Sequence, residues 1–168
     1  MIIGRWLKKH RKQLTVHSLV IGIFILYCLF VAVPLFDRFE SIEGEARLHK
    51  LSLPIVTNNI QGRIDKIDIY THTIEIDGWA FIKDEGSENS DIYLVFKSDD
   101  KTYVFDTVSK VRLDVIEYFS EAGINLVNPG FNAIIPVRKI ERDHYDVGIY
   151  IKKGDIEALQ YTSRVVEF

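Results

Sequence analysis

The amino-acid sequence predicts an all-β protein, an antiparallel β-sandwich with one short connector helix, preceded by a single N-terminal transmembrane helix. Two observations support this prediction. Residues 14–36 form an apolar run without Asp, Glu, Lys or Arg. After residue 60, hydrophobic residues recur with period two in several short segments separated by turn signals, which is typical of half-buried strands. The chain therefore divides into a basic tail (1–13), a transmembrane helix (14–36), a stalk and linker (37–60) and a β domain (61–168).

The apolar run over residues 14–36 is long enough to cross a membrane. As a helix rising about 1.5 Å per residue it reaches about 35 Å, against about 30 Å for the hydrocarbon core of a bilayer. A cleaved signal peptide is the alternative, but the run is too long and no A-x-A-like site follows, so we expect an uncleaved anchor. Ser18, Gly22 and Cys28 form a stripe of small residues along which another helix could approach closely.

The charge distribution predicts on which side of the membrane each part lies. The first 13 residues carry five Lys and Arg and no acid, and removing this +5 from the formal net charge of −3 leaves −8 for the remainder. By the positive-inside rule, the N-terminus is cytoplasmic and the β domain lies outside the plasma membrane. An acidic domain disfavours nucleic acid and anionic lipid headgroups as partners.

The segment after the apolar run predicts a stalk and then a linker. Residues 37–50 place Phe39, Ile42 and Ala46 at helical spacing among charges, which favours a short amphipathic helix. A proline and a polar triplet then predict a linker over residues 51–60.

The strand pattern begins at residue 61. The first segment, RIDKIDI, breaks its alternation between Ile64 and Ile67, which predicts either a β-bulge or a change of face. The second segment, THTIEIDGWAFI, alternates strictly. Its two faces are Ile74, Ile76, Gly78, Ala80 and Ile82 on one side and Thr73, Glu75, Asp77, Trp79 and Phe81 on the other.

The later segments complete the predicted β domain. DIYLVFK and TYVFDTV predict a hairpin, and GFNAIIPV, HYDVGIYIK and ALQYTSRVVEF predict three more strands. This number of short strands in a domain of this size is typical of an immunoglobulin-like or jelly-roll sandwich. Residues 111–130 are the exception, because Val115, Tyr118 and Phe119 have helical spacing there. They predict a long connector with one short helix.

Trp79 and Phe81 are candidate ligand-binding residues. Strict alternation places both on the charged face of their strand, where two adjacent aromatic rings could stack on a sugar ring or contact a partner protein. A bulge at Gly78 would instead turn Trp79 into the core, the more frequent position of tryptophan in such sandwiches and the one we expect. A third possibility is that another strand or the 111–129 connector covers this face.

Arg112 and Asp114 are the second candidate pair. They lie two residues apart, so on an extended segment they project to the same side. We expect an ion pair that pins the start of the connector. The functional alternative is a pair of hydroxyl-binding groups at a glycan site.

The sequence offers little for catalysis or metal binding. It holds no G-x-S-x-G, no glycine-rich phosphate loop and no H-E-x-x-H. His144 lies among carboxylates in residues 141–146, where we expect a solvated polar turn. Residues 84–91 contain four acids without the EF-hand order, so a solvated loop is favoured over a calcium site. We therefore expect no enzymatic activity, no cofactor and no metal.

Five short motifs follow one another along the domain. They are Gly78-Trp79-Ala80, Arg112-Leu113-Asp114-Val115, Gly130-Phe131, Tyr145-Asp146-Val147-Gly148-Ile149-Tyr150-Ile151 and Tyr161-Thr162. In this order they resemble small β-sandwich modules of bacterial cell-surface glycan systems. Such modules are accessory domains beside or fused to glycosyltransferases that build capsule, teichoic acid and related wall polymers. The resemblance covers residues 60–168 and omits the anchor, and this sequence contains no transferase domain.

Together these observations predict a non-catalytic single-pass membrane protein. The resemblance implies that its external domain binds a glycan or a partner glycosyltransferase in bacterial surface-polysaccharide assembly. The candidate ligand-binding residues are Trp79, Phe81, Arg112 and Asp114. The alternative is a structural or regulatory subunit of a larger membrane complex, a transferase or a transporter, with no glycan binding of its own.

Overall fold

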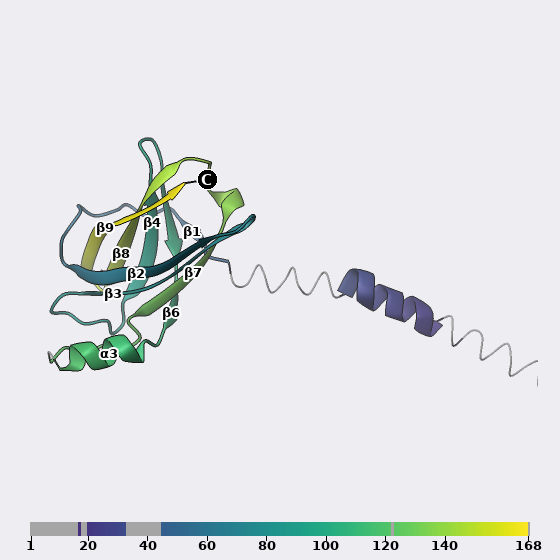
Figure 1. Cartoon of the computed structure of the whole chain (residues 1–168), viewed down its shortest axis with the longest axis horizontal. Helices are drawn as coiled ribbons and strands as arrows, with labels where there is room; N and C mark the ends of the chain where they lie inside the picture. Colours follow the sequence, from purple (N-terminus) through teal and green to yellow (C-terminus); the bar gives the residue numbers. More distant parts are fainter. Residues whose placement is uncertain (1–16, 18–19, 33–44, 122, 168) are drawn as a thin grey trace, which may run out of the picture. The chain divides into compact units, whose positions relative to one another are not determined.

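The computed structural model describes residues 17, 20–32, 45–121 and 123–167 (Figure 1). The chain forms two units, Met1–Gly44 and Glu45–Phe168, and each is described by itself.

The first unit contains one described helical segment. Residues 20–27 are α-helical and continue into the π-helical turn η1 (Cys28–Ala32). Within the described ranges, no helix combines the length and the apolar character needed to cross a membrane. The rest of the predicted transmembrane helix apart from His17, the predicted tail and residues 37–44 of the predicted stalk lie outside the described residues.

The second unit consists of two antiparallel β-sheets and one short α-helix. In chain order its elements are β1 (Leu48–His49), β2 (Ile60–Ile69), β3 (Thr73–Ile82), β4 (Asp91–Lys97), β5 (Thr102–Asp106), β6 (Val108–Lys110), α3 (Leu113–Ser120), β7 (Gly130–Pro136), the 3-10 turn η2 (Val137–Lys139), β8 (His144–Lys153) and β9 (Ile156–Glu167). One sheet has the order β1-β5-β4-β8-β9 and the other the order β2-β3-β7-β6 (Figure 1). The predicted all-β domain with one short connector helix is confirmed at this level.

One main hydrophobic core joins the two sheets. Ile74, Ile76 and Ala80 of β3 are completely buried in it, and Leu94 of β4 and Ile149 of β8 enter it from the other sheet. The inward residues of β3 are those that strict alternation placed on one face, because successive side chains of a strand point to opposite sides.

A bulge interrupts β2 at its centre. Ile64 and Lys66 pair with consecutive residues of β3, while Asp65 has no residue opposite it. Ile64 on one side of the bulge and Ile67 on the other both pack into the main core. Of the two arrangements that the broken alternation allowed, the bulge is the one that forms.

Two features differ from the predicted elements. Residues 45–50 do not continue a stalk helix, because Ala46 is buried in the main core and donates its N–H to Ile134 O at 2.7 Å, and β1 pairs with β5. The segment TYVFDTV is not one strand, because β5 and β6 belong to different sheets. Thr107, between them, donates its hydroxyl to Ile92 O at 2.8 Å. In both places contacts with distant residues determine the backbone path.

A smaller apolar cluster lies on the outer face of each sheet. On the β2-β3-β7-β6 sheet, Phe81 is buried with Val115, Phe119 and Leu126 from α3 and the connector after it. On the other sheet, Leu53 from the segment before β2 packs against buried side chains of β4, β5, β8 and β9. The rest of the outer face of the β2-β3-β7-β6 sheet carries charged and amide side chains, and these form the candidate site.

Candidate functional site

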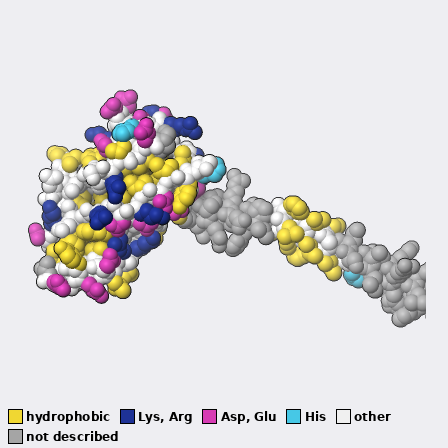
Figure 2. All heavy atoms as spheres, viewed as in Figure 1, with side chains coloured by type: hydrophobic (Ala, Val, Ile, Leu, Met, Phe, Trp, Pro, Cys, Tyr) yellow, Lys and Arg dark blue, Asp and Glu magenta, His cyan; other side chains and the backbone are white. Residues whose placement is uncertain are grey.

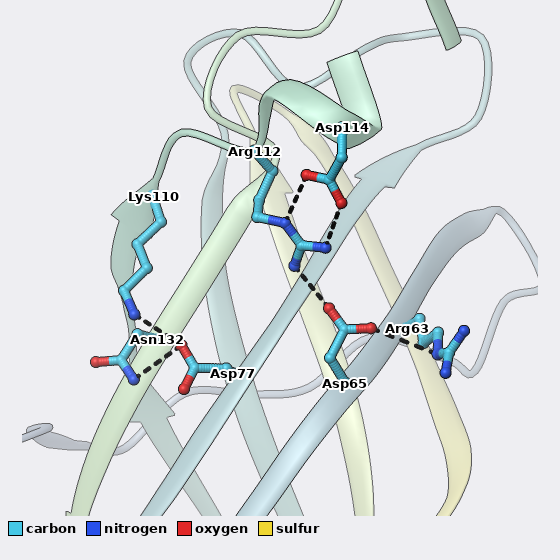
Figure 3. A network of polar contacts seen from close by, with 7 residues as sticks. All are labelled: Arg63, Asp65, Asp77, Lys110, Arg112, Asp114 and Asn132. Carbon is cyan, nitrogen blue, oxygen red and sulfur yellow. Dashed lines mark hydrogen bonds and ion pairs between the residues drawn. The ribbon is translucent and has the colours of Figure 1, made fainter. Parts of the chain in front are cut away.

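The outer face of the β2-β3-β7-β6 sheet carries a network of polar side chains beside α3, which we call the polar face. Its members are Arg63, Asp65, Asp77, Lys110, Arg112, Asp114 and Asn132 (Figure 3). Figure 2 shows basic and acidic side chains intermixed on the surface where β2 and β3 run. The polar face therefore presents paired charges of both signs.

Arg112 is the centre of this network. Its Nε and Nη2 atoms donate to the two carboxylate oxygens of Asp114 at 2.9 and 2.7 Å, and its Nη1 donates to Asp65 Oδ2 at 2.6 Å. The hydrogen bonds from Arg112 lower the pKa of Asp114 to about 2. Hydrogen bonds to Asp114 and Asp65 raise the pKa of Arg112. Asp114 and Arg112 therefore stay ionised across the physiological range.

The bulge in β2 places Asp65 where Arg112 can reach it. A bulge redirects a side chain that regular alternation would send elsewhere, and here the strand keeps Ile64 in the core while Asp65 reaches the outer face. Arg63 Nε lies 3.4 Å from the other oxygen of Asp65. Asp65 thus connects the middle of β2 to the segment just before α3.

Asp77 forms the second centre of the polar face. Its Oδ1 accepts hydrogen bonds from Lys110 Nζ at 2.7 Å and from Asn132 Nδ2 at 3.2 Å (Figure 3). These partners come from β6 and β7, so one carboxylate on β3 connects three neighbouring strands. Such preformed contacts fix the direction of each polar group before any ligand arrives.

Gly130 provides the space that Arg112 occupies. A Cβ atom at Gly130 would lie 2.6 Å from Arg112 Cγ and 2.8 Å from Lys110 O. The aliphatic part of the arginine therefore lies directly over the backbone of β7, and only glycine permits this approach.

Trp79 and Phe81 lie on the same outer face, beside the polar groups. Their rings are stacked with centroids 6.1 Å apart, and the ring of Phe119 contacts both, at 5.6 Å from Trp79 and 4.9 Å from Phe81. Phe81 is completely buried, whereas Trp79 is half-buried. Of the three arrangements considered from the sequence, the connector covering this face is the one observed.

The expectation that a bulge at Gly78 turns Trp79 into the core is wrong. β3 pairs with β7 without a register shift through Gly78 and Trp79. The place of a side chain at Gly78 is filled by the ring of Phe131, because a Cβ there would lie 2.6 Å from Phe131 Cζ. The glycine is therefore an inward-facing residue of a regular strand, and Trp79 keeps its outward position.

The expected ion pair between Arg112 and Asp114 is present, and it pins the start of the connector as anticipated. Sequence reasoning missed Asp65, Asp77, Lys110 and Asn132 as members of the same network. Asp77 was placed correctly on the outer face of its strand, which is the only signal that the sequence offered. Asp65, Lys110 and Asn132 come from three other strands, β2, β6 and β7.

The turn around His144 lies apart from the polar face. Asp143 and His144 line a shallow groove together with Asp99 of the β4–β5 turn. The N–H of His144 donates to the carboxylate of Asp143, which lowers the pKa of that side chain. The geometry is that of a polar turn.

The acidic loop over residues 84–91 is attached to the connector. Ser87 Oγ donates to Val127 O and accepts from Val127 N, both at 2.8 Å. Across the described ranges, no group of three or more His, Cys, Asp or Glu side chains has an arrangement that could hold a metal ion.

The motifs that carry the resemblance contact one another in space. In one sheet Gly78 accommodates Phe131 and Gly130 accommodates Arg112, as described above. In the other sheet a Cβ at Gly148 would lie 3.0 Å from Tyr161 Cδ1, and Thr162 donates its hydroxyl to Val147 O at 2.7 Å. Each glycine of these motifs is thus matched to a side chain of a later or earlier motif, which gives the motifs a packing role.

Comparisons with protein-family models, with curated proteins and with solved structures found no match. The geometry of the polar face and the pattern of the sequence are therefore the grounds for a functional proposal.

Proposed function

We propose that this chain is a single-pass membrane protein whose external sandwich domain binds a glycan, without catalysis, in the assembly of a bacterial surface polysaccharide. The observation that carries the proposal is the polar face, where guanidinium, carboxylate and amide groups are held in fixed directions beside a half-buried tryptophan. Planar groups of this kind donate and accept the hydrogen bonds that sugar hydroxyls require.

Preorganisation is the feature that favours binding. Each carboxylate of the polar face already receives a hydrogen bond or ion pair from a neighbouring strand or from Arg112. A ligand that adds hydrogen bonds to such groups does not have to immobilise them first, so less conformational entropy is lost on binding. The exposed part of Trp79 adds an apolar surface against which the C–H groups of a sugar ring can pack.

The same pairing disfavours acid–base catalysis. A general acid needs a pKa near the working pH, which requires burial or a nearby like charge. Asp114 has the opposite environment, since Arg112 lowers its pKa to about 2. The polar face is therefore proposed as a binding surface.

The topology part of the proposal rests on the sequence. The uncharged run over residues 14–36 supports a membrane anchor, and the five basic residues before it support a cytoplasmic N-terminus. The acidic remainder, including the domain with the polar face, would then lie on the outer side of the plasma membrane. Surface polysaccharides are assembled on that side.

A glycan array tests the proposal. The probe is the unit of residues 45–168, which has its own core, compared with its Trp79→Ala and Asp77→Asn variants. We expect the wild-type unit to bind and the affinity of each variant to fall at least about tenfold. Trp79→Ala removes the apolar contact with the sugar ring, and Asp77→Asn removes the charge of a hydrogen-bond acceptor. Lys152→Ala, which removes an exposed ion pair with Glu157 on the other sheet, is the matched control and should bind normally. A folded wild-type unit that binds no glycan on the array would exclude this function.

The second candidate function is that of a subunit in a larger membrane complex. Apolar side chains are exposed from β6 through α3, namely Val108, Val111, Leu113 and Tyr118, the last with 72% of its surface accessible. Exposed apolar residues that gather in one region mark protein interfaces more often than sugar sites. Co-purification of the full chain in detergent, followed by mass spectrometry, should then yield a stoichiometric partner that Leu113→Glu releases and Lys152→Glu does not.

A further inference from the structure

β2 is the edge strand of its sheet. It lies at the end of the β2-β3-β7-β6 sheet and pairs with β3 alone among the described strands. Half of the backbone N–H and C=O groups of an edge strand point away from its partner, so they can pair with a further strand. Arg63 and Lys66 are exposed along β2, with 70% and 60% of their side chains accessible, and each forms an exposed ion pair within the chain, Arg63 with Asp65 and Lys66 with Asp68.

The charges along β2 are complementary to themselves when the strand is reversed. The segment reads Arg63-Ile64-Asp65-Lys66-Ile67-Asp68. In an antiparallel pair of two copies centred on residues 65 and 66, Arg63 of one copy lies opposite Asp68 of the other, and Asp65 lies opposite Lys66. Opposite charges face each other in every charged pair, which stabilises the pairing of two strands.

The bulge makes this register geometrically possible. Ile64 and Ile67 are three positions apart, so in a regular strand they would point to opposite faces. Because the bulge supplies one extra residue between them, both point into the core, while Arg63 and Asp68 share the outer face. The bulge lies at the centre of the charge pattern. A twofold axis through it therefore places each residue of one β2 strand opposite a residue of the other strand that points to the same face.

The ends of the segment also fit each other. Ile69 is 50% exposed although it is a large apolar residue on the inward-facing side of β2, and in this register it lies opposite Gly62 of the other copy. A Cβ atom at Gly62 would lie 2.7 Å from Ala80 Cβ, so this position cannot carry a side chain. The exposed isoleucine thus lies opposite the only glycine of β2.

We infer that the chain forms a symmetric dimer in which the β2 strands of two copies pair antiparallel, with Arg63 opposite Asp68 and Asp65 opposite Lys66. Bulges and charges on an edge strand usually prevent pairing. Here they favour the self-complementary register, because a shift by one residue places opposite faces together and a shift by two places Arg63 opposite Lys66 or Asp65 opposite Asp68. The dimer joins two four-stranded sheets into one and sets the two polar faces side by side, which would raise the avidity for a repeating ligand. The inference does not require the function proposed above.

The mass of the full chain, purified in detergent and measured by size exclusion with multi-angle light scattering, tests this inference. The wild type should be dimeric, and Arg63→Asp should shift it to monomer with a dissociation constant at least about tenfold higher, because like charges then face each other twice. Asp68→Arg should do the same. The double variant Arg63→Asp with Asp68→Arg should be dimeric again.

Mixing the two single variants gives the sharpest test. A chain with Arg63→Asp and a chain with Asp68→Arg each repel a copy of themselves. When the two are mixed, the two acidic side chains at positions 63 and 68 of the first chain lie opposite the two basic ones of the second, so the mixture should form a heterodimer. Arg164→Asp, the same charge change at an exposed residue of β9, should leave the wild-type dimer intact. A monomeric wild type, a dimer that survives Arg63→Asp, or single variants that fail to associate when mixed would each overturn the inference. Circular dichroism of every variant verifies that the fold is retained.

Discussion

Arg112 Nη1 donates to Asp65 Oδ2 at 2.6 Å and joins two residues that are 47 positions apart in the sequence. The contact links the bulge of β2 to the start of the connector that carries α3. It depends on two local features, the extra residue in β2 and the absence of a side chain at Gly130. This guanidinium group therefore connects the start of α3 to the bulge of β2.

Loss of this guanidinium should destabilise the domain measurably. For Arg112→Ala we expect the free energy of unfolding to fall by about 1 to 2 kcal/mol. The bidentate ion pair with Asp114 and the charge-assisted hydrogen bond to Asp65 are both lost, and the site is partly exposed. Arg112→Lys should recover part of the loss, because an ammonium can contact Asp65 or Asp114 but cannot reproduce the fork. Urea denaturation of residues 45–168 measures both, and Arg164→Ala should leave the midpoint unchanged.

The stability of the domain should fall in acid partly through Asp114. Its pKa is about 2 in the folded state, below the value of about 4 in an unfolded chain. The unfolded state therefore binds the proton first as the pH falls, and the stabilisation is present above pH 4 and lost between about pH 4 and pH 2. Urea midpoints at pH 5, 4, 3 and 2 should show a shallower decline for Asp114→Asn than for the wild type. Parallel curves for the two proteins would contradict this assignment.

Two glycines should differ in their tolerance of a methyl group. Gly78→Ala places a Cβ 2.5 Å from Arg63 O and 2.6 Å from Phe131 Cζ, and the backbone oxygen cannot move aside. Gly148→Ala meets ring atoms of Tyr161 at 3.0 and 3.1 Å, which a side-chain rotation can relieve. We expect losses of about 3 kcal/mol for Gly78→Ala and about 1 kcal/mol for Gly148→Ala. Thermal unfolding of residues 45–168 ranks them, and equal melting temperatures would disprove the packing argument.

Adjacent aromatic residues of α3 should have unequal roles. Phe119 is 7% exposed and contacts Trp79 and Phe81, whereas Tyr118 is 72% exposed. Phe119→Ala should lower the stability by about 3 kcal/mol, and Tyr118→Ala should change it by less than about 0.5 kcal/mol. Trp79 is the only tryptophan after residue 6, so the fluorescence of residues 45–168 should shift to the red in Phe119→Ala alone.

Local patterns in the sequence were sufficient to assign the faces of β3. Its inward residues and its outward Asp77, Trp79 and Phe81 all follow from period-two alternation, and the break between Ile64 and Ile67 located the irregularity in β2. The ion pair of Arg112 with Asp114 was also within reach, because its two residues are only two positions apart. These features depend on the few residues around each position.

The sequence by itself determined an all-β domain, an uncharged run of membrane-spanning length before it, and the side of each residue in the best-defined strand. Only the tertiary structure decided that β5 and β6 enter different sheets, that the connector covers Phe81, and that Asp65 and Asp77 join distant cations on one face. The physical reason is the range of the interactions. Alternation and turn chemistry act over a few residues, whereas the partner of a buried ring or a charged edge residue is set by which strands the whole chain brings together.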